Sequence, residues 1–338
     1  MNKSVTLVGN FAHAGTGIGT TNYSLLKGLI QTNIDLKIFN SDSFTEILPK
    51  IPLRRKLAYA LFLHIRDKNI HFLDPDVFKH VKNAKVITTF QDLYVFDNRK
   101  QDSNNSILRY QRRKKFNEAF KLSTKIIAIS SKTKEDLLER YGESFSDKIV
   151  TVNGVIDDKF FLTKLHCRTK NSKKIVIGYI NNFSWNKIEK LRFFIETFKK
   201  IKDNTLEFNI YGKNFPFSNL ISDDYRIKYL GFLPEEKIVQ TIQSFDVYLS
   251  TSIIEGIGLP ILQAKALGVP VLCYNGELDN KVINNTIIWE DSTLLGILKH
   301  RSWEKSRVIT KAKKDAEAFK LNNVLPKLIR VYSDTFDW

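Results

Sequence analysis

The strongest constraint on the fold is the segment from Asp246 to Cys273, which reads DVYLSTSIIEGIGLPILQAKALGVPVLC. An apolar run leads into a glycine-rich turn, then into an apolar helical stretch that opens at Pro260, stops at Gly268 and is followed by a second apolar run. Such short apolar runs on either side of a helix are typical of parallel strands that are buried on both faces of a sheet. The segment therefore predicts a complete strand, helix and strand unit.

Similar apolar runs alternate with longer amphipathic stretches along the whole chain of 338 residues. We expect strands at 5–8, 36–39, 86–90, 126–129, 175–180, 206–211, 246–250 and 269–273. Residues 160–174 lose this periodicity and gain charge, as a linker does. Because the chain is too long for one ordinary core, we predict an α/β protein with domains at 1–164 and 165–321, and a helix at 322–338 that is a candidate to cross back.

The charge balance restricts the partners. Lys and Arg number 53 against 36 Asp and Glu, which gives a net charge of +17 and favours nucleic acid, nucleotide phosphates or an anionic membrane. Cys167 and Cys273 are too few for a disulfide framework or a cysteine-rich metal site. With no signal peptide pattern and no apolar run of about 18 residues, we expect a cytoplasmic protein whose membrane contact is peripheral.

The glycine-rich turn predicts an anion site. Gly256 and Gly258 let the backbone turn tightly and approach a ligand, because no Cβ is in the way. Pro260 suits the first helical position, so the preceding amides and the positive end of the helix dipole would face the turn. A phosphate is the natural occupant, and Glu255 and Gln263 are placed to reach hydroxyl groups of the same ligand.

The stretch from Glu255 to Gln263 resembles the EX7E region of the family 4 retaining glycosyltransferases, which have the GT-B fold. Gly15-Thr16-Gly17-Ile18-Gly19 is similar to the first glycine loop of that family, and residues 125–161 are similar to its strand, helix and Asn-Gly-Val segment. Tyr229-Leu230-Gly231-Phe232-Leu233 is similar to the loop that packs on the nucleotide base. The resemblance covers nearly the whole chain. It implies two Rossmann-like domains with parallel sheets facing a central cleft, the N-terminal one binding the acceptor and the C-terminal one the nucleotide sugar.

The resemblance also implies an activity and its residues. A sugar would move from a nucleoside diphosphate to a hydroxyl of a lipid- or polymer-linked glycan, with retention and without a metal or other cofactor. The implied catalytic residues are Glu255, Lys187 and Asp92. The implied donor-binding residues are Gly15, Gly17, Lys190, Gly231, Phe232, Gly256, Ile257, Gly258, Leu259 and Gln263. In these roles Lys187 and the turn amides hold the diphosphate, Glu255 the donor sugar, Gln263 the ribose, and Gly231 and Phe232 the base.

The chain departs from the family pattern at three places. Gln263 stands where the family has its second Glu, so the ribose contact keeps hydrogen bonding but lacks the charge. No Arg precedes Lys187 or Lys190, one of which takes the place of the family's diphosphate lysine. Gln91-Asp92 replaces the His-Asp of many members, so the imidazole is absent.

Other readings of the sequence remain open. Asp74-Pro75-Asp76 is an Asp-x-Asp pattern, for which we predict a turn and not a metal site. The run from Arg109 to Lys115 is either a solvated helix face or, with Arg54, Arg55 and Lys56, a surface for an anionic membrane. A nicotinamide-dependent dehydrogenase would show GxGxxG and an acid where Asn40 stands, and this chain has neither. An RNA-binding protein would explain the positive charge, but no aromatic and basic recognition box appears.

Overall fold

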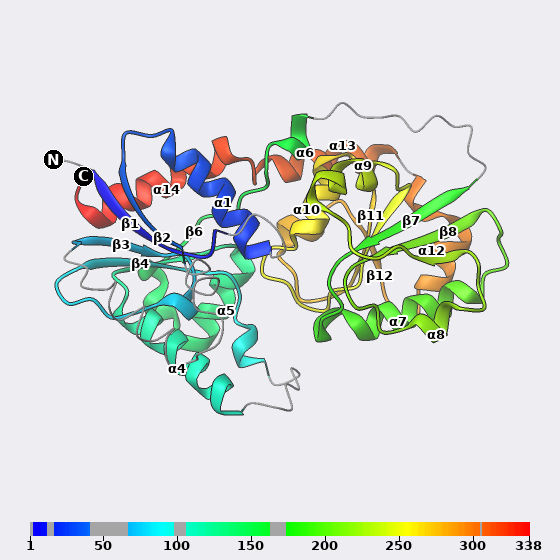
Figure 1. The fold of residues 1–338 in the computed structure, drawn as a ribbon, viewed down its shortest axis with the longest axis horizontal. Helices are drawn as coiled ribbons and strands as arrows, with labels where there is room; N and C mark the ends of the chain where they lie inside the picture. Colours follow the sequence, from blue (N-terminus) through cyan, green and yellow to red (C-terminus); the bar gives the residue numbers. More distant parts are fainter. Residues whose placement is uncertain (1–2, 12–16, 41–66, 98–105, 163–173, 305) are drawn as a thin grey trace. The chain divides into compact units, whose positions relative to one another are not determined.

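The computed structural model describes residues 3–11, 17–40, 67–97, 106–162, 174–304 and 306–338. The chain divides into two compact units, which Figure 1 shows as two groups of strands and helices. The first unit comprises Met1–Asp157 and Phe319–Trp338, and the second comprises Asp158–Ala318. The chain therefore enters the second unit once and returns to the first unit for its last helix.

The described part of the first unit is built on a six-stranded parallel sheet in the order β2-β1-β3-β4-β5-β6. Its strands are β1 (Ser4–Gly9), β2 (Asp35–Asn40), β3 (Asn69–Phe72), β4 (Lys85–Phe90), β5 (Lys125–Ala128) and β6 (Ile149–Thr151). Side chains alternate between the two faces, because successive residues of a strand point in opposite directions. In β1, Val5 and Leu7 join one hydrophobic cluster and Val8 joins the other.

Helices cover both faces of this sheet. Helices α1 (Gly17–Ile30) and α14 (Leu321–Phe336) lie on one face, and α4 (Ser106–Leu122) and α5 (Ser131–Tyr141) lie on the other (Figure 1). Three 3₁₀ turns, η1 (Pro75–Val77), η2 (Tyr94–Phe96) and η3 (Glu143–Lys148), connect them. Helix α14 is tied to the unit at its start, where the amide of Ile156 donates to the carbonyl of Phe319 at 2.9 Å.

The second unit has its own six-stranded parallel sheet among the described residues, in the order β12-β11-β10-β7-β8-β9. Its strands are β7 (Ile175–Ile180), β8 (Leu206–Tyr211), β9 (Ile227–Tyr229), β10 (Val247–Ser250), β11 (Val271–Tyr274) and β12 (Ile287–Trp289). From β7 the chain runs outward through β8 and β9, and then returns to the other side of β7 with β10. The direction of winding thus reverses between β7 and β10, which is where open α/β sheets bind their ligands.

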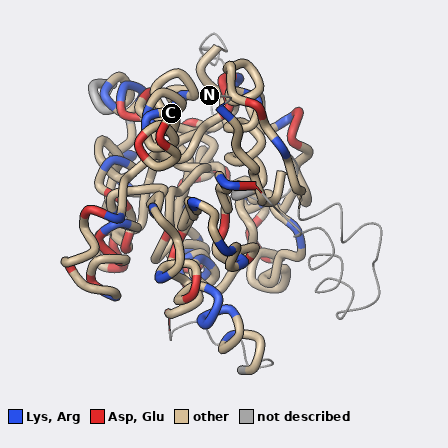
Figure 2. The backbone as a smooth tube through the Cα atoms, turned by 90° about the vertical axis from the view of Figure 1, so that its left-hand side faces the viewer, with Lys and Arg blue, Asp and Glu red and all other residues tan. Residues whose placement is uncertain are grey.

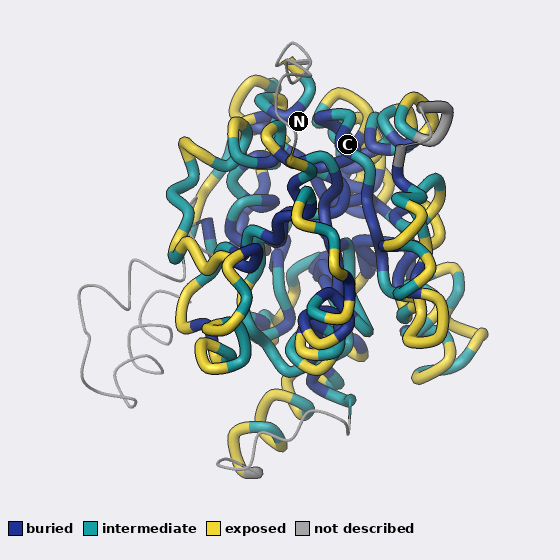
Figure 3. The backbone as a smooth tube through the Cα atoms, turned by 90° about the vertical axis from the view of Figure 1, so that its right-hand side faces the viewer, coloured by how far each residue is buried: buried dark blue, intermediate teal, exposed yellow. Residues whose placement is uncertain are grey.

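Two layers of helices enclose this second sheet. Helices α7 (Trp185–Lys199), α8 (Ser218–Ile221) and α12 (Leu294–His300) lie on one face, and α9 (Ile238–Gln243), α10 (Leu259–Ala266) and α13 (Ser306–Glu317) lie on the other (Figure 1). The short helices α6 (Lys159–Leu162) and α11 (Asn280–Ile283) and the 3₁₀ turns η4 (Glu235–Lys237) and η5 (Ser302–Glu304) complete the unit. Figure 3 shows dark blue strands inside and yellow helix turns outside, as expected for a sheet buried on both faces.

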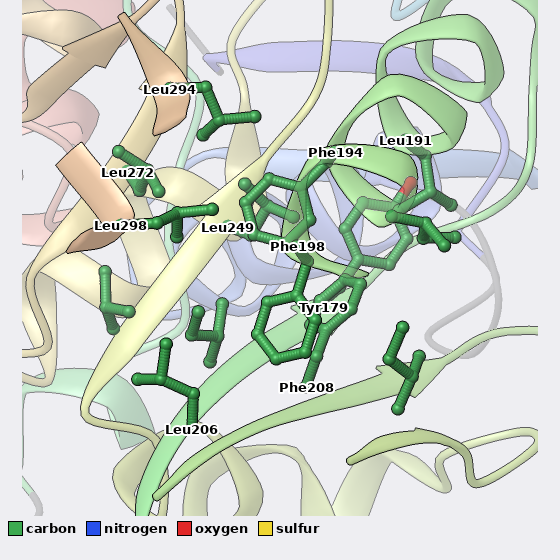
Figure 4. Close-up of a cluster of buried hydrophobic side chains, with 14 of the residues drawn as sticks. Tyr179, Leu191, Phe194, Phe198, Leu206, Phe208, Leu249, Leu272, Leu294 and Leu298 are labelled. Atoms are coloured by element: carbon green, nitrogen blue, oxygen red, sulfur yellow. The ribbon is translucent and has the colours of Figure 1, made fainter. Parts of the chain in front are cut away.

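Aromatic side chains fill the core under α7. Phe194 and Phe198 of this helix are fully buried and pack on Phe208 of β8, with the rings of Phe194 and Phe208 4.9 Å apart (Figure 4). Burial of a Phe side chain is worth about 1.5 to 3 kcal/mol. This contact fixes α7 on the sheet, and with it the residues at the helix start.

All eight strands predicted from apolar runs are confirmed; β7 and β8 match at both ends, and no end of the others differs by more than two residues. Four strands were not predicted: β3, β6, β9 and β12. β6, β9 and β12 have only three residues each, and β3 has four, so none of them forms a clear apolar run. The polar His71 also interrupts β3, although it is fully buried there.

Candidate active site

The glycine-rich turn lies between β10 and α10 in the second unit. Gly258 has φ +63°, a left-handed conformation that favours glycine. The predicted start of the helix at Pro260 is wrong by one residue: α10 begins at Leu259, because Gly258 caps it and Pro260 takes the second position. Gly268, with φ +76°, follows the helix and lets the chain turn into β11, as predicted.

The backbone amides of the turn point to an anion. In the described part of the chain, the N–H groups of residues 256–259 donate to no carbonyl or side chain. The first amides of a helix lack partners within the helix, and the helix dipole adds a partial positive charge at this end. The turn therefore offers the anion-binding amides that the sequence predicts at residues 256–259.

Lys187 and Glu255 meet beside this turn. The ammonium Nζ of Lys187 lies 2.8 Å from Oε1 of Glu255, and their side chains are only 9% and 16% exposed. The hydroxyl of Ser252 donates to the same Oε1 at 2.8 Å. Charge-assisted hydrogen bonds with so little exposure are shielded from water and hold both side chains in one geometry. The structure therefore brings together two of the three predicted catalytic residues.

Neighbouring polar groups position Lys187. It lies in the first turn of α7, where a cation opposes the helix dipole, and the carboxylate of Glu255 offsets this repulsion. Its Nζ reaches Oδ1 of Asn182 at 3.5 Å, and Thr251 donates its hydroxyl to the Lys187 carbonyl at 3.1 Å. Among the described residues, these contacts leave one of the three ammonium donors for a further acceptor.

Asn186 joins the start of α7 to the loop after β10. Its side-chain amide donates to the carbonyl of Ile254 at 2.9 Å, and its own carbonyl accepts from the amide of Ile253 at 2.9 Å. The loop is held from the other side by Glu277, whose amide donates to the carbonyl of Ile253 at 2.7 Å. A Cβ on Gly276 would lie 2.7 Å from the carbonyl of Ser252, so this close approach requires glycine. In the sequence, only the polar runs after β7 and β10 hint at these supports.

Lys190 is directed to a different carboxylate. Its Nζ lies 2.8 Å from Oδ2 of Asp291 and 4.8 Å from the ring centre of Tyr274. Burial acts to lower the Lys190 pKa, but hydrogen bonds to Asp291 and Tyr274 raise it above its ordinary value. Of the two candidate lysines, Lys187 is the one that contacts Glu255.

Gln263 lies one turn into α10 and is half-buried. Within the described part of the chain, its side chain has no hydrogen-bond partner. The position on the helix that borders the turn is consistent with a contact to the same ligand as residues 256–259.

The loop after β9 exposes an aromatic side chain. Gly231 has φ +77°, a left-handed conformation that favours glycine. The side chain of Phe232 is 55% exposed. The ammonium of Lys213 lies 4.4 Å from the centre of the Phe232 ring. The carbonyl of Gly231 accepts from the amide of Gly212 at 2.9 Å, which fixes the loop at the carboxyl edge of the sheet. The loop thus presents a flat apolar face next to a cation.

The structure describes two of the three predicted site residues of the first unit, Asp92 and Gly17. Asp92 follows β4 and accepts from the amide of Tyr94 at 3.0 Å, which forms the start of η2. Gly17 is the first residue of α1, and Gly15 lies outside the described residues. Arg54, Arg55 and Lys56 also lie outside them.

Asp74-Pro75-Asp76 forms a turn, as predicted. The Asp74 carboxylate accepts from the amide of Asp76 at 2.6 Å and caps η1. Burial, with the nearby charge of Asp76, raises the Asp74 pKa to about 7. Arg112 donates from Nε to both oxygens of Asp76, at 2.9 and 3.0 Å.

Much of the basic run of α4 is used inside the first unit. Besides Arg112, Arg113 donates to the carbonyls of Val95 and Phe96 at 2.9 and 3.3 Å, and Lys115 donates to the carbonyl of Asp76 at 2.6 Å. These bonds fasten η1 and η2 to α4. Arg112, Lys114 and Lys115 remain exposed, so the run is a solvated helix face, but the sequence does not show that turn carbonyls and a carboxylate accept from several of its cations.

A small cavity of about 30 Å³ lies in the first unit between α1, α14 and the sheet. Thr21 lines it, and its buried hydroxyl has no partner among the described residues. A volume of this size holds about one water molecule.

Two observations concern membranes and metals. None of the helices described is long and apolar enough to cross a membrane. Nor do three or more His, Cys, Asp or Glu side chains gather, within the described ranges, in a way that could hold a metal ion.

Comparisons with known proteins find glycosyltransferases. Residues 174–293 match the family model described as "Glycosyl transferases group 1". O-antigen chain mannosyltransferase B of Escherichia coli is 24% identical over 315 residues, which cover 77% of this chain and 79% of that protein. Residues 174–293, which match the family model, contain the Lys187–Glu255 pair, the glycine-rich turn and the Gly231 loop.

Solved structures resemble the chain over nearly its whole length. Sucrose-phosphate synthase from Thermosynechococcus elongatus superposes with a TM-score of 0.75 at 15% identity, over 99% of both chains. WaaG, a glycosyltransferase involved in lipopolysaccharide biosynthesis, superposes with a TM-score of 0.69 at 12% identity, over 98% of this chain and 99% of that chain. These likenesses show the GT-B fold.

Proposed function

We propose that this chain, a glycosyltransferase of the GT-B type, is a retaining enzyme that moves a sugar from a nucleoside diphosphate to a hydroxyl of a lipid- or polymer-linked glycan. The observation that carries the proposal is the 2.8 Å contact between Lys187 and Glu255 beside the unpartnered amides of residues 256–259. A cation, a carboxylate and helix amides thus lie close together, where the direction of winding reverses between β7 and β10.

The first requirement of such a transfer is a site for the leaving group. As the bond to the sugar breaks, negative charge develops on the β-phosphate, and preorganised donors stabilise it best. Lys187 has a donor left for a phosphate oxygen, and the amides of residues 256–259 supply more. We assign the diphosphate to these groups and not to Lys190, because Asp291 already holds the Lys190 ammonium.

The donor sugar and the nucleoside take the neighbouring positions. Glu255 is proposed to accept hydrogen bonds from sugar hydroxyls while it keeps Lys187 in place. Gln263 is proposed to bind the ribose. Gly231 and Phe232 are proposed to hold the base, since an exposed aromatic face stacks on any base. No further cofactor is invoked.

The stereochemical proposal rests on the resemblance to the retaining glycosyltransferases. A double displacement needs a nucleophile on the opposite face of the sugar from the leaving group. Among the described residues, Glu255 is the one carboxylate that we assign to the donor sugar, and it is bound to Lys187 and Ser252. We therefore propose attack from the leaving-group face, with a phosphate oxygen accepting the acceptor proton. Asp92 is the proposed contribution of the first unit to acceptor binding.

A glycan acceptor is supported by the name of a relative. The Escherichia coli protein that matches over most of both chains is an O-antigen chain mannosyltransferase. A growing polysaccharide carried on a lipid would need an enzyme at the cytoplasmic face of a membrane. We propose that location, with the enzyme docked peripherally on an anionic surface.

The start of α4 is the proposed docking surface. Ile107, Leu108 and Tyr110 are 67%, 53% and 69% exposed, and Lys114 is a surface cation on the same helix. Figure 2 shows α4 as the lowest helix, with a tan end followed by blue segments. Apolar side chains that enter the lipid interface, next to cations each worth about 1 kcal/mol, give salt-sensitive binding.

The test begins with binding. A panel of nucleoside diphosphates and nucleotide sugars is screened by thermal shift, because a ligand that binds the folded state raises its stability by RT ln(1 + [L]/Kd). We expect one nucleoside diphosphate to raise the melting temperature and oligonucleotides to leave it unchanged. Saturable binding of an oligonucleotide, or of NAD alone, would favour an RNA-binding protein or a dehydrogenase and reject the proposal.

Transfer is then tested with a matched pair of variants. Glu255→Gln should abolish most of the transfer from the donor identified by thermal shift. Glu207→Gln is the control, because Glu207 is a similarly buried carboxylate that pairs with Lys228 at 2.8 Å near the amino end of β8. Equal activity of the two folded variants would contradict the assignment of Glu255.

A further inference from the structure

Lys265 is a charged residue in the interior of the second unit. It lies on α10, two residues after Gln263, and its side chain is 0% exposed. Its Nζ donates to the carbonyls of Lys281 at 3.2 Å, Val282 at 3.1 Å and Asn284 at 2.9 Å. These carbonyls belong to α11 and to the residue that follows it. The ammonium of Lys265, a residue of α10, thus caps the C-terminal end of α11.

Helix α11 in turn packs on the glycine-rich turn. A Cβ on Gly258 would lie 3.1 Å from Cγ1 of Val282, so α11 closes the space beside the turn. The start of α11 is fixed by Asp279, which is buried and accepts from the amide of Lys281 at 2.8 Å. With its start capped by Asp279 and its end by Lys265, α11 has a defined place against Gly258.

One carboxylate completes the arrangement. Asp315 of α13 lies 3.3 Å from the Lys265 ammonium and accepts from the side-chain amide of Asn285 at 2.8 Å. Burial lowers the Lys265 pKa, and Asp315 acts against this shift. An apolar residue of similar volume usually serves stability at a buried position as well as an ion pair does. The charge is therefore better explained by the geometry it imposes on α11 than by stability.

We propose that Lys265 is a positioning residue for donor binding: by holding α11 against the turn, it fixes the amides of residues 256–259 in the arrangement that a diphosphate requires. The inference rests on the proposed donor site. Lys265 itself does not touch the donor. Loss of the Lys265 ammonium should therefore weaken the affinity for the nucleoside diphosphate. Because the Lys187–Glu255 pair is held by other residues, kcat at saturating donor should stay close to the wild-type value.

The experiment compares two lysine variants of the full chain. Lys265→Met removes the ammonium and keeps most of the side-chain volume. Lys199→Met is the matched control in the same unit, because Lys199 also donates to a helix-end carbonyl, that of Leu220 at 3.0 Å, and pairs with an aspartate, Asp223. The Kd for the nucleoside diphosphate found by thermal shift is measured by calorimetry, and KM and kcat are measured for the matching donor.

We expect Lys265→Met to raise Kd and KM roughly 2- to 30-fold, with kcat changed by less than about twofold. Lys199→Met should lower the melting temperature without changing Kd. An unchanged Kd in Lys265→Met, or an equal rise in both variants, would overturn the inference and leave the donor site in place. Failure of the wild-type protein to bind any nucleoside diphosphate would instead overturn the proposed function, and this inference with it.

A second variant keeps the inference testable if Lys265→Met does not fold. Asp315→Asn removes the carboxylate that stabilises the buried ammonium of Lys265, so the folded variant should raise Kd in the same direction as Lys265→Met. Hydrogen exchange of residues 282–284, whose amides are hydrogen-bonded in and just after α11, should become faster. Faster exchange with an unchanged Kd would show that the carbonyl bonds hold α11 but do not position the site.

Discussion

Acidification should destabilise the first unit through His71. This residue of β3 is fully buried, with Nδ1 2.7 Å from the hydroxyl of Tyr332 and Nε2 2.7 Å from that of Thr89. Burial lowers its pKa from 6.5 to about 3. Between these two values the unfolded chain binds a proton that the folded chain does not, so stability falls as the pH falls below 6.5.

The size of the effect follows from the two pKa values. With 6.5 in the unfolded state and about 3 in the folded state, lowering the pH from 7.5 to 4.5 costs about 2.5 kcal/mol. Domains are stable by only about 5 to 15 kcal/mol, so this loss is large. Asp74 acts in the opposite direction, because its raised pKa of about 7 means that stability is lost as the pH rises towards that value.

The assay is urea unfolding followed by circular dichroism, at several pH values, for wild type, His71→Gln and His300→Gln. Gln at position 71 keeps hydrogen bonding but does not titrate. His300 is exposed and serves as the control. The difference between wild type and His71→Gln cancels the contribution of Asp74 and of every other group. We expect the wild type to lose about 2.5 kcal/mol more than His71→Gln, and His300→Gln to follow the wild type. Identical pH dependence in wild type and His71→Gln would refute the reasoning.

Four further outcomes are expected. Glu255→Ala should keep the fold and slow transfer roughly tenfold to over a hundredfold, because a hydrogen bond to a charged group is worth about 1.5 to 3 kcal/mol; wild-type turnover in the folded variant would remove Glu255 from the site. Gln263→Glu should change the Kd for the nucleoside diphosphate without abolishing transfer, and unchanged affinity and donor preference would separate Gln263 from the ribose. Transfer should survive a chelator of divalent metals, whereas a complete loss that manganese restores would point to a metal at Asp74. Replacing Ile107 and Tyr110 with Ser should reduce co-sedimentation with anionic vesicles, and a wild-type protein that binds neither anionic nor neutral vesicles would favour a soluble acceptor.

The sequence by itself determined the strands that carry the fold and the turn that carries the site. Seven of the eight predicted strands were readable because strands buried on both faces of a parallel sheet consist of apolar runs; the eighth, β2, is an exposed edge strand. Gly258 and Pro260 were readable because backbone geometry restricts what else can stand in a turn that opens a helix. Both signals are local, so a single chain is enough to detect them.

The tertiary structure alone decided which side chains meet. Lys187 contacts Glu255 because β7 and β10 are neighbours in the sheet, and the order of strands is set by the packing of whole helices and not by any local pattern. For the same reason the sequence does not show that Lys265 is buried, where α11, the residue after it and α13 supply four acceptors. The basic run of α4 likewise holds two turns that are close to it only in the folded unit. Contacts between distant segments depend on how elements pack, and the sequence of each element does not specify this.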